Sequence, residues 1–170
     1  APGTTDVVLT PETNFPIHVF SSYDNDGAIS TGKNRTGLGL RHNNLLGLDD
    51  IFLVGYTGGR DFNSRYVYHN IPVSPNGTSL LYGLSRSQSI PTKEFAPYDI
   101  RSKSNDASIS LHQDLFTDKG PLGEAWVGFA AKDKTTTMTT GTYSRDRLRI
   151  IDIGASLTFK GMASSTTFSP

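Results

Sequence analysis

The sequence contains no cysteine among its 170 residues. This absence excludes disulfide frameworks, thiolate zinc sites, iron–sulfur clusters and cysteine nucleophiles. An excess of charge of either sign is also missing, because 16 basic residues balance 16 acidic ones. A nucleic-acid binder usually carries a strong positive charge, so a neutral chain with a pI near 7.1 disfavours a DNA- or RNA-binding role.

Long hydrophobic runs are missing as well. No stretch approaches the roughly 18 consecutive apolar residues that a membrane-spanning helix needs. No segment sustains the apolar spacing i, i+3, i+4, i+7 of an amphipathic helix together with helix caps. The sequence therefore excludes a helical membrane protein, but it leaves open a β-barrel, whose strands alternate in polarity.

Alternation of apolar and polar residues with a period of two runs through most of the chain. The clearest segment is 150–160, where one strand face would carry Ile151, Ile153, Ala155, Leu157 and Phe159. Shorter alternating segments lie around residues 15–19, 38–40, 52–56, 66–68, 80–84, 109–111 and 125–129. The pattern predicts an all-β fold of about eight strands with no long helix, in which Ile151, Ile153, Leu157 and Phe159 face lipid.

The connections between these segments differ in length. Residues 74–78 contain Asn76-Gly77, which predicts a tight type I′ hairpin turn. Short links are also expected over 43–50 and 116–123, and long polar links over 87–105 and 131–147. Rough alternation of short and long links is typical of an up-and-down barrel, with short periplasmic turns and longer extracellular loops. We therefore expect a periplasmic turn at 74–78 and an extracellular loop at 87–105.

Several ionisable residues fall on the polar phase of the expected strands. His18, Arg41, His112 and Asp152 are the pore-lining candidates, because a hydrated lumen can solvate charged groups at little cost. The same phase places His69 on the polar face. Trp126 and the tyrosines fit either an aromatic girdle at the membrane surface or the ordinary aromatic content of a β protein.

No motif for a catalytic, cofactor-binding or metal-binding site is found. Asp24-Asn25-Asp26-Gly27 resembles the start of a calcium loop, but Lys33 occupies the position that needs a glutamate, which favours a simple turn. Gly37-Leu38-Gly39 lacks the third glycine of a dinucleotide-binding loop. We therefore expect neither a cofactor nor enzymatic activity.

The region 41–86 carries a family resemblance. Asn43-Asn44-Leu45-Leu46-Gly47-Leu48-Asp49-Asp50, the strand at 51–56 and the hairpin at 66–84 resemble the start of the barrel in two-partner secretion transporters, the haemolysin secretion/activation proteins. Residues 2–9 resemble the last strand of the periplasmic POTRA domain that precedes this barrel. Residues 23–27 and 31–35 resemble the first hairpin of the family.

This resemblance implies the first half of a 16-stranded transmembrane barrel in the outer membrane of a Gram-negative bacterium. The expected divisions are the end of a periplasmic POTRA-like element at 1–11, barrel strands at 12–160 and an irregular tail at 161–170. The implied partners are the lipid bilayer and a secreted protein. Two alternatives stay open on the residues alone, namely a soluble β-sandwich and a carbohydrate-binding surface module.

Overall fold

The structure is a computed structural model that describes residues 15–117, 120–160 and 165–168. Nine strands and one short 3₁₀ helix make up these residues. They are β1 (Ile17–Asp24), β2 (Arg35–Asn43), β3 (Ile51–Gly59), β4 (Phe62–Ser74), β5 (Thr78–Ser89), η1 (Lys93–Tyr98), β6 (Arg101–Thr117), β7 (Gly120–Met138), β8 (Gly141–Lys160) and β9 (Ser165–Phe168).

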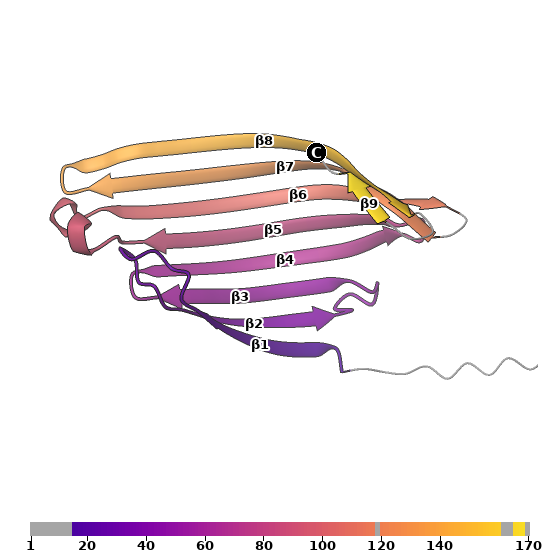
Figure 1. Cartoon of the computed structure of the whole chain (residues 1–170), viewed down its shortest axis with the longest axis horizontal. Helices are drawn as coiled ribbons and strands as arrows, with labels where there is room; N and C mark the ends of the chain where they lie inside the picture. The colour runs from indigo at the N-terminus through magenta and orange to yellow at the C-terminus, as the bar shows by residue number, and fades with distance from the viewer. Residues whose placement is uncertain (1–14, 118–119, 161–164, 169–170) are drawn as a thin grey trace, which may run out of the picture.

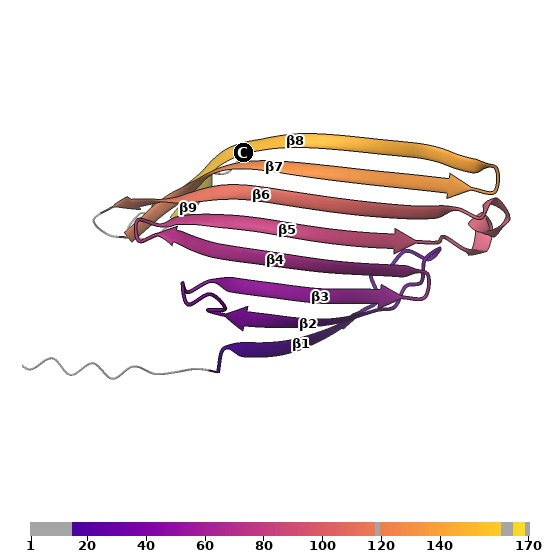
Figure 2. The ribbon, with the colours of Figure 1, turned by 180° about the vertical axis from the view of Figure 1, so that it is seen from behind.

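All nine strands belong to one sheet, and their order in the sheet is their order in the chain. Each strand pairs with the next in the antiparallel sense, so the chain runs up and down without a crossover (Figures 1 and 2). The predicted all-β, up-and-down antiparallel fold is therefore confirmed, and all eight expected strands are present as β1 to β8. Within the described residues the sheet is open, with β1 and β9 at its edges.

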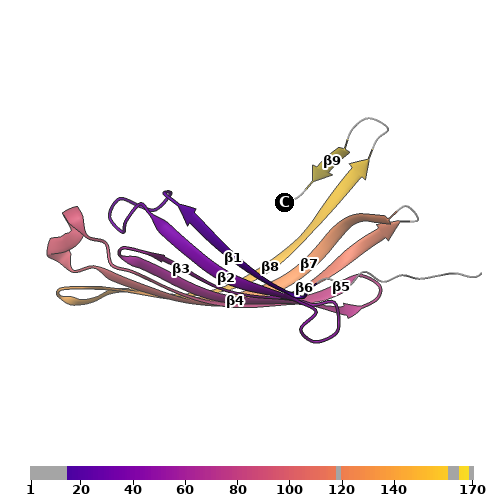
Figure 3. The same cartoon turned by 90° about the horizontal axis from the view of Figure 1, so that it is seen from below.

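The sheet is twisted and curved, so that β1 and β8 cross at an angle when the molecule is seen along the stack of strands (Figure 3). This is the usual consequence of the right-handed twist of each strand. The strands differ in length, from 8 residues in β1 to 17, 19 and 20 residues in β6, β7 and β8. A tilted strand needs only about 9 to 11 residues to cross a bilayer, so β6 to β8 are long enough to extend beyond it.

The expected long link over 131–147 is wrong. β7 continues to Met138 and β8 begins at Gly141, which leaves only Thr139 and Thr140 between them. The alternation of apolar and polar residues did not reveal these strands, because both faces of this hairpin are polar while the backbone pairing continues. Strand propensity remains in the β-branched Thr135-Thr136-Thr137 run.

The turn after β4 has a different geometry from the predicted one. It is a three-residue link, Pro75-Asn76-Gly77, and of these only Gly77 has a positive φ, at 78°. A type I′ turn would need two such residues, whereas a three-residue hairpin needs one, at the position where glycine stands. Proline fixes φ for the start of the turn, and the Ser74 hydroxyl accepts a hydrogen bond from the Asn76 amide at 3.1 Å.

Links at one end of the sheet are joined to each other. The Asp61 amide between β3 and β4 donates to the Thr31 carbonyl at 3.0 Å, and the Thr92 amide before η1 donates to the Ser30 carbonyl at 2.8 Å. The Thr139 amide in the β7–β8 turn donates to the Tyr98 carbonyl at 3.0 Å. The connections after β1, β3, β5 and β7 therefore form one hydrogen-bonded rim.

The expected irregular tail at 161–170 is wrong for four of its residues. Ser165–Phe168 forms β9, which pairs with β8 from Leu157 to Lys160. An edge strand presents unpaired amides and carbonyls, and these favour the addition of any nearby extended segment. The POTRA-like element expected at 1–11 lies outside the described residues, as does the side chain of Phe159.

The sheet has no hydrophobic core of its own. Within the described part of the chain, no hydrophobic residue is buried, and large apolar side chains such as Val19, Ile151 and Ile153 are 70% to 73% exposed. The same residues contain no helix that is long and apolar enough to span a membrane. A β-sandwich would bury one sheet face against a second sheet, and the described residues form only one sheet. The soluble sandwich alternative therefore does not fit.

Candidate functional site: the polar face of the sheet

Side chains alternate between two faces, and the strand register shows which residues share a face. We call one the apolar face; its central residues are Val19, Leu38, Leu40, Val54, Val67, Leu84, Ile109, Leu111, Val127, Phe129, Ile151 and Ile153. We call the other the polar face; it carries serine, glycine, aromatic and ionisable residues. The predicted lipid-facing residues Ile151, Ile153 and Leu157 all lie on the apolar face.

The four pore-lining candidates lie on the same face. His18 is directly opposite Arg41 in the β1–β2 register, His112 is opposite Trp126, and Asp152 is opposite Gly128. Following the register from strand to strand puts all four on the polar face. The structure therefore agrees with their predicted phase, while their role in lining a pore remains a prediction.

His18 and Arg41 form a first group through Asn43. The Arg41 Nε donates to the Asn43 Oδ1 at 2.8 Å, and the Asn43 Nδ2 lies 3.2 Å from the His18 Nε2. The three side chains come from β1 and the end of β2 and are at least partly exposed. Asn43 was not among the predicted residues, although its position two residues after Arg41 gives it the same strand phase.

His112 and Asp152 belong to a second group on β6, β7 and β8. The His112 Nδ1 hydrogen-bonds to the Glu124 carboxylate, and its Nε2 lies 2.9 Å from the Ser110 hydroxyl. The His112 ring also stacks on Trp126, whose Nε1 donates to the Asp152 carboxylate at 2.6 Å. Trp126 thus connects two predicted residues that are 40 positions apart in the sequence. Strands β3 to β5 separate this group from the first.

The order serine, histidine, carboxylate in this group resembles a hydrolase triad, but the surroundings do not complete such a site. Catalysis of acyl transfer needs free hydrogen-bond donors aimed at the developing oxyanion. Ser110 lies in β6, which pairs along this region with β5 on one side and β7 on the other. The backbone amides around Ser110 are therefore engaged in the sheet, and the contacts hold the side chains of this group in place on the polar face.

Aromatic rings cover glycines on the neighbouring strands of the polar face. A Cβ added to any of these glycines would overlap the ring that covers it. The pairs are Phe20 on Gly39, Tyr66 on Gly55, Tyr68 on Gly83 and Trp126 on Gly154. Glycine weakens a strand because it has no side chain to pack, and a neighbouring ring can supply the missing contact. At these four places on the polar face, the ring fills the space that a side chain would take at the glycine.

These pairs show which face of the sheet three of the aromatic residues occupy. Tyr66, Tyr68 and Trp126 lie on the polar face, so they are not part of a lipid-facing girdle. In the alternating sequence pattern, Tyr66 and Tyr68 count as the apolar residues of the segment 66–68, which would place them on the apolar face. The signal that could have placed these tyrosines on the correct face is a glycine directly opposite each of them, on β3 and on β5. An aromatic ring and a glycine pack well across two strands.

The polar-face placement of His69 is wrong for the same reason. Once Tyr68 lies on the polar face, His69 must lie on the apolar one, where it is opposite Phe52 and Tyr82. It is only 3% exposed, because the Asn44–Asp50 link folds beside it and Asp50 itself is completely buried. The sequence did not predict this contact, which joins residues 19 positions apart.

A short polar chain satisfies these buried groups. The His69 Nε2 lies 2.6 Å from the Asp50 Oδ2, and the His69 Nδ1 lies 2.9 Å from the Tyr82 hydroxyl. The other Asp50 oxygen accepts the Leu46 amide at 2.7 Å, and the Asp50 carbonyl accepts the Asn44 amide at 2.6 Å. Buried polar atoms are costly unless they are hydrogen-bonded, so this chain fixes the β2–β3 link against β4 and β5.

The pKa of Asp50 is lowered from its ordinary value of 3.8. Burial of the carboxyl would raise the pKa, but the hydrogen bonds from His69 and from backbone amides, Leu46 among them, outweigh that effect. Because the folded-state pKa is below the unfolded one, Asp50 stabilises the fold above pH 3.8. This contribution is lost as the pH falls through the lowered value.

We expect the Asp50→Asn variant of the full-length protein to melt at a lower temperature than the wild type at pH 7. Its amide cannot reproduce the charged acceptor that holds His69 and the link. The wild type should lose this advantage on acidification below about pH 4, so the two melting temperatures should converge. Heat-modifiable gel mobility measured from pH 7 to pH 3 gives the comparison.

Asp49→Asn is the matched control, because Asp49 is the exposed neighbour and carries the same charge. Its backbone amide, which donates to the Asn44 side chain at 2.8 Å, is retained. Equal melting temperatures for wild type and Asp50→Asn at pH 7 would show that the hydrogen bonds of buried Asp50 do not stabilise the link between β2 and β3.

The Asp24 segment has the geometry of a turn. The Asp26 amide donates to the Asp24 Oδ1 at 3.1 Å, which is an Asx turn of the kind that the sequence favoured. Within the described residues, no group of three or more histidine, aspartate or glutamate side chains is arranged to hold a metal ion.

Comparisons with known proteins agree on one family. A model of the haemolysin secretion/activation proteins ShlB/FhaC/HecB matches residues 3–166. The outer membrane transporter CdiB-2 of Burkholderia pseudomallei (strain 1026b) is 41% identical over 64 residues, which are 38% of this chain and 11% of that protein. The solved structure of CdiB from Escherichia coli covers 93% of this chain at a TM-score of 0.79 and 21% identity. That likeness shows the fold, and the match spans 31% of the CdiB chain.

Proposed function

Because the chain belongs to the haemolysin secretion/activation protein family, we propose that it forms about half the wall of a pore that secretes a partner protein. Its location is the outer membrane of a Gram-negative bacterium, as for the outer membrane transporters of this family. The proposal concerns the part that the chain plays in a longer protein, since it spans less than a third of the solved relative.

The opposite polarity of the two sheet faces carries the proposal. An apolar face without a buried core is unfavourable in water, and the acyl chains of a bilayer remove this cost. In a closed barrel every backbone amide and carbonyl is paired between strands, which a membrane requires. Closure would place the serine-, glycine- and histidine-bearing face inside, where water solvates it.

The orientation follows from the direction of the first strand. If β1 enters the membrane from the periplasm, the links after β2 and β4 lie in the periplasm, including the Pro75–Gly77 turn. The links after β1, β3, β5 and β7 then lie outside the cell. Under this orientation the hydrogen-bonded rim, with η1 between β5 and β6, faces the exterior.

The proposed activity is transport without a chemical step. An extended protein chain passing through a pore meets many weak contacts, and no bond is made or broken. The polar face offers such contacts in two separate groups, around Arg41 and around His112. No catalytic residue, cofactor or metal ion is part of the proposal.

We expect graded effects when His18, Arg41, His112 and Asp152 are changed one at a time to alanine in the full-length protein. Each side chain has hydrogen-bond partners on the polar face, and the four lie in two separate groups, so the loss of one leaves the other contacts in place. Secretion of the cognate partner into the medium should fall by no more than a few fold in each variant, which is the effect of about 1 kcal/mol.

Two controls make this experiment decisive. Heat-modifiable mobility must show that each variant barrel is assembled, and Ser108→Ala provides a mild change on the same face. If a single variant is assembled and yet secretes nothing, passive lining is the wrong role for that residue. If the wild-type protein secretes no partner at all, the proposed function itself fails.

A further inference from the structure

We propose that Arg65 and Arg86, together with the apolar hollow beside them, bind a lipid whose headgroup carries phosphate. This site would lie on the lipid-facing side of the sheet, near the outer leaflet. The inference rests on the proposed function, because it uses the orientation given above. It concerns the opposite face from the residues proposed to line the pore.

The two arginines are direct neighbours across β4 and β5 on the apolar face. Both are exposed. Among the described residues, neither has a carboxylate at ion-pair distance, whereas Arg60, Arg101 and Arg149 each have one. Like charges directly opposite each other in a sheet repel, so this pair favours a shared anion. The planar guanidinium fork matches the oxygens of a phosphate group.

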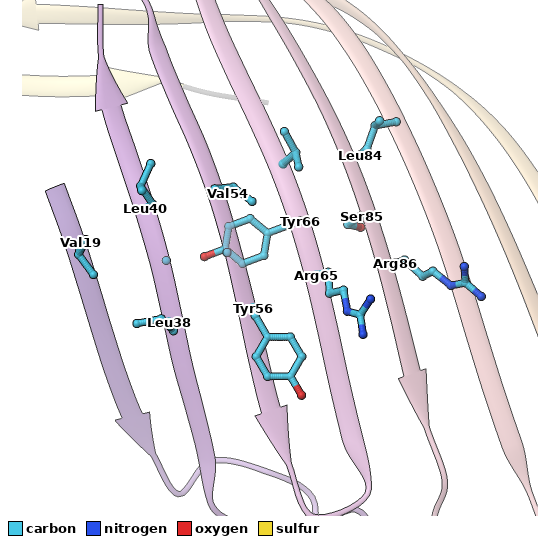
Figure 4. Close-up of a pocket in the computed structure, with 13 residues that line it drawn as sticks. Val19, Leu38, Leu40, Val54, Tyr56, Arg65, Tyr66, Leu84, Ser85 and Arg86 are labelled. Carbon is cyan, nitrogen blue, oxygen red and sulfur yellow. The ribbon is translucent and has the colours of Figure 1, made fainter. Parts of the chain in front are cut away.

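An apolar hollow adjoins the pair. It has a volume of about 790 Å³, and both arginines contribute to its lining. Figure 4 shows Arg65 and Arg86 side by side, with Val54 and Leu84 on neighbouring strands. The remaining aliphatic lining residues are Val19, Leu38, Leu40 and Val67. A free phosphate ion would use only the arginines, whereas a phosphorylated lipid would place its acyl chain along the hollow.

Positive charge continues along the same face beyond this pair. The register runs from Arg65 and Arg86 through Asn105 and Asp133 to Arg147 on β8. Lys103, Arg145 and Arg149 share this face on β6 and β8, and Asp133 is the acidic residue among them. The whole chain has a formal net charge of zero, so basic residues are concentrated here. Basic residues next to an apolar belt are placed where lipid phosphates lie.

The test uses the purified full-length protein in neutral detergent micelles. Bisphosphorylated lipid A is added, and the number of bound lipids is counted by native mass spectrometry. The Arg65→Gln/Arg86→Gln variant should bind about 30-fold more weakly, the effect expected from removing two basic contacts to an anionic headgroup. Lys132→Gln/Lys134→Gln makes the same change of charge on the polar face of β7 and should bind like the wild type.

Two further measurements identify what is bound. Dephosphorylated lipid A should bind wild type and Arg65→Gln/Arg86→Gln equally weakly, and millimolar inorganic phosphate should not displace the intact lipid. Equal binding of lipid A by wild type and the double variant would overturn the proposal. So would full displacement by inorganic phosphate, which would indicate a simple anion site. Both variants should still secrete the partner protein, so loss of lipid binding alone is distinguishable from failure of the proposed function.

Discussion

Replacing Ile153 by arginine in the full-length protein is expected to lower the free energy of unfolding from a bilayer by about 2 to 4 kcal/mol if the residue lies near the midplane. Ile153 is 73% exposed and lies on the apolar face opposite Val127. Its neighbours on that face, Ile151 and Phe129, are also apolar and exposed. An arginine there would have to carry its charge out of the hydrocarbon region or draw water into it.

Denaturant titration of the protein in phosphatidylcholine vesicles measures this loss. Ser108→Arg is the control, because Ser108 lies on the polar face, where a hydrated lumen can solvate the charge. This variant should remain within about 0.5 kcal/mol of the wild type, as is usual for substitutions that disturb no packed or buried group. A larger loss for Ser108→Arg than for Ile153→Arg would mean that the two faces have been assigned the wrong way round.

Replacing Gly154 by valine is expected to destabilise the protein by about 1 to 3 kcal/mol, the usual cost of adding atoms where a neighbour already fills the space. The Trp126 ring lies over Gly154, so any side chain at this position must displace it. Displacement would also disturb the 2.6 Å hydrogen bond from Trp126 to Asp152 and the stacking of Trp126 on His112. The same denaturant titration in vesicles measures the effect.

A double-mutant cycle isolates the ring as the cause. In a Trp126→Ala background the space above Gly154 is free, so the added valine should cost little or even stabilise the strand through its β propensity. If Gly154→Val costs as much without the tryptophan as with it, the ring does not set the requirement for glycine at position 154.

The sequence predicted strands β1 to β8 and their up-and-down order, because the apolar face leaves a period-two signal in each of them. The signal is strong in β8, where Ile151, Ile153 and Leu157 share a face. It disappears in the outer part of the β7–β8 hairpin, where both faces are polar. Those residues were therefore expected to form a loop, although threonine-rich strands continue there.

The sequence predicted which face of the sheet the candidate residues occupy, but it did not predict which side chains they contact. Strand phase alone put His18, Arg41, His112 and Asp152 on one face, and the structure agrees. The contacts of His18 with Asn43, of His112 with Glu124 and of Asp152 with Trp126 cross between strands, so they depend on strand register, which a single sequence does not specify. The Asp50–His69 contact could not be predicted from strand patterns, because it forms only where the link between β2 and β3 folds beside β4.

Spin labels at positions 152 and 153 test most directly the claim that one face meets lipid and the other meets water. The chain has no cysteine, so Asp152→Cys and Ile153→Cys each introduce one labelling site into it. In bilayer-embedded full-length protein, the label at 153 should collide with lipid-soluble oxygen and be shielded from aqueous nickel reagents. The label at 152 should show the opposite preference, because adjacent strand residues point to opposite faces. Nickel access at 153 with oxygen access at 152 would contradict the claim.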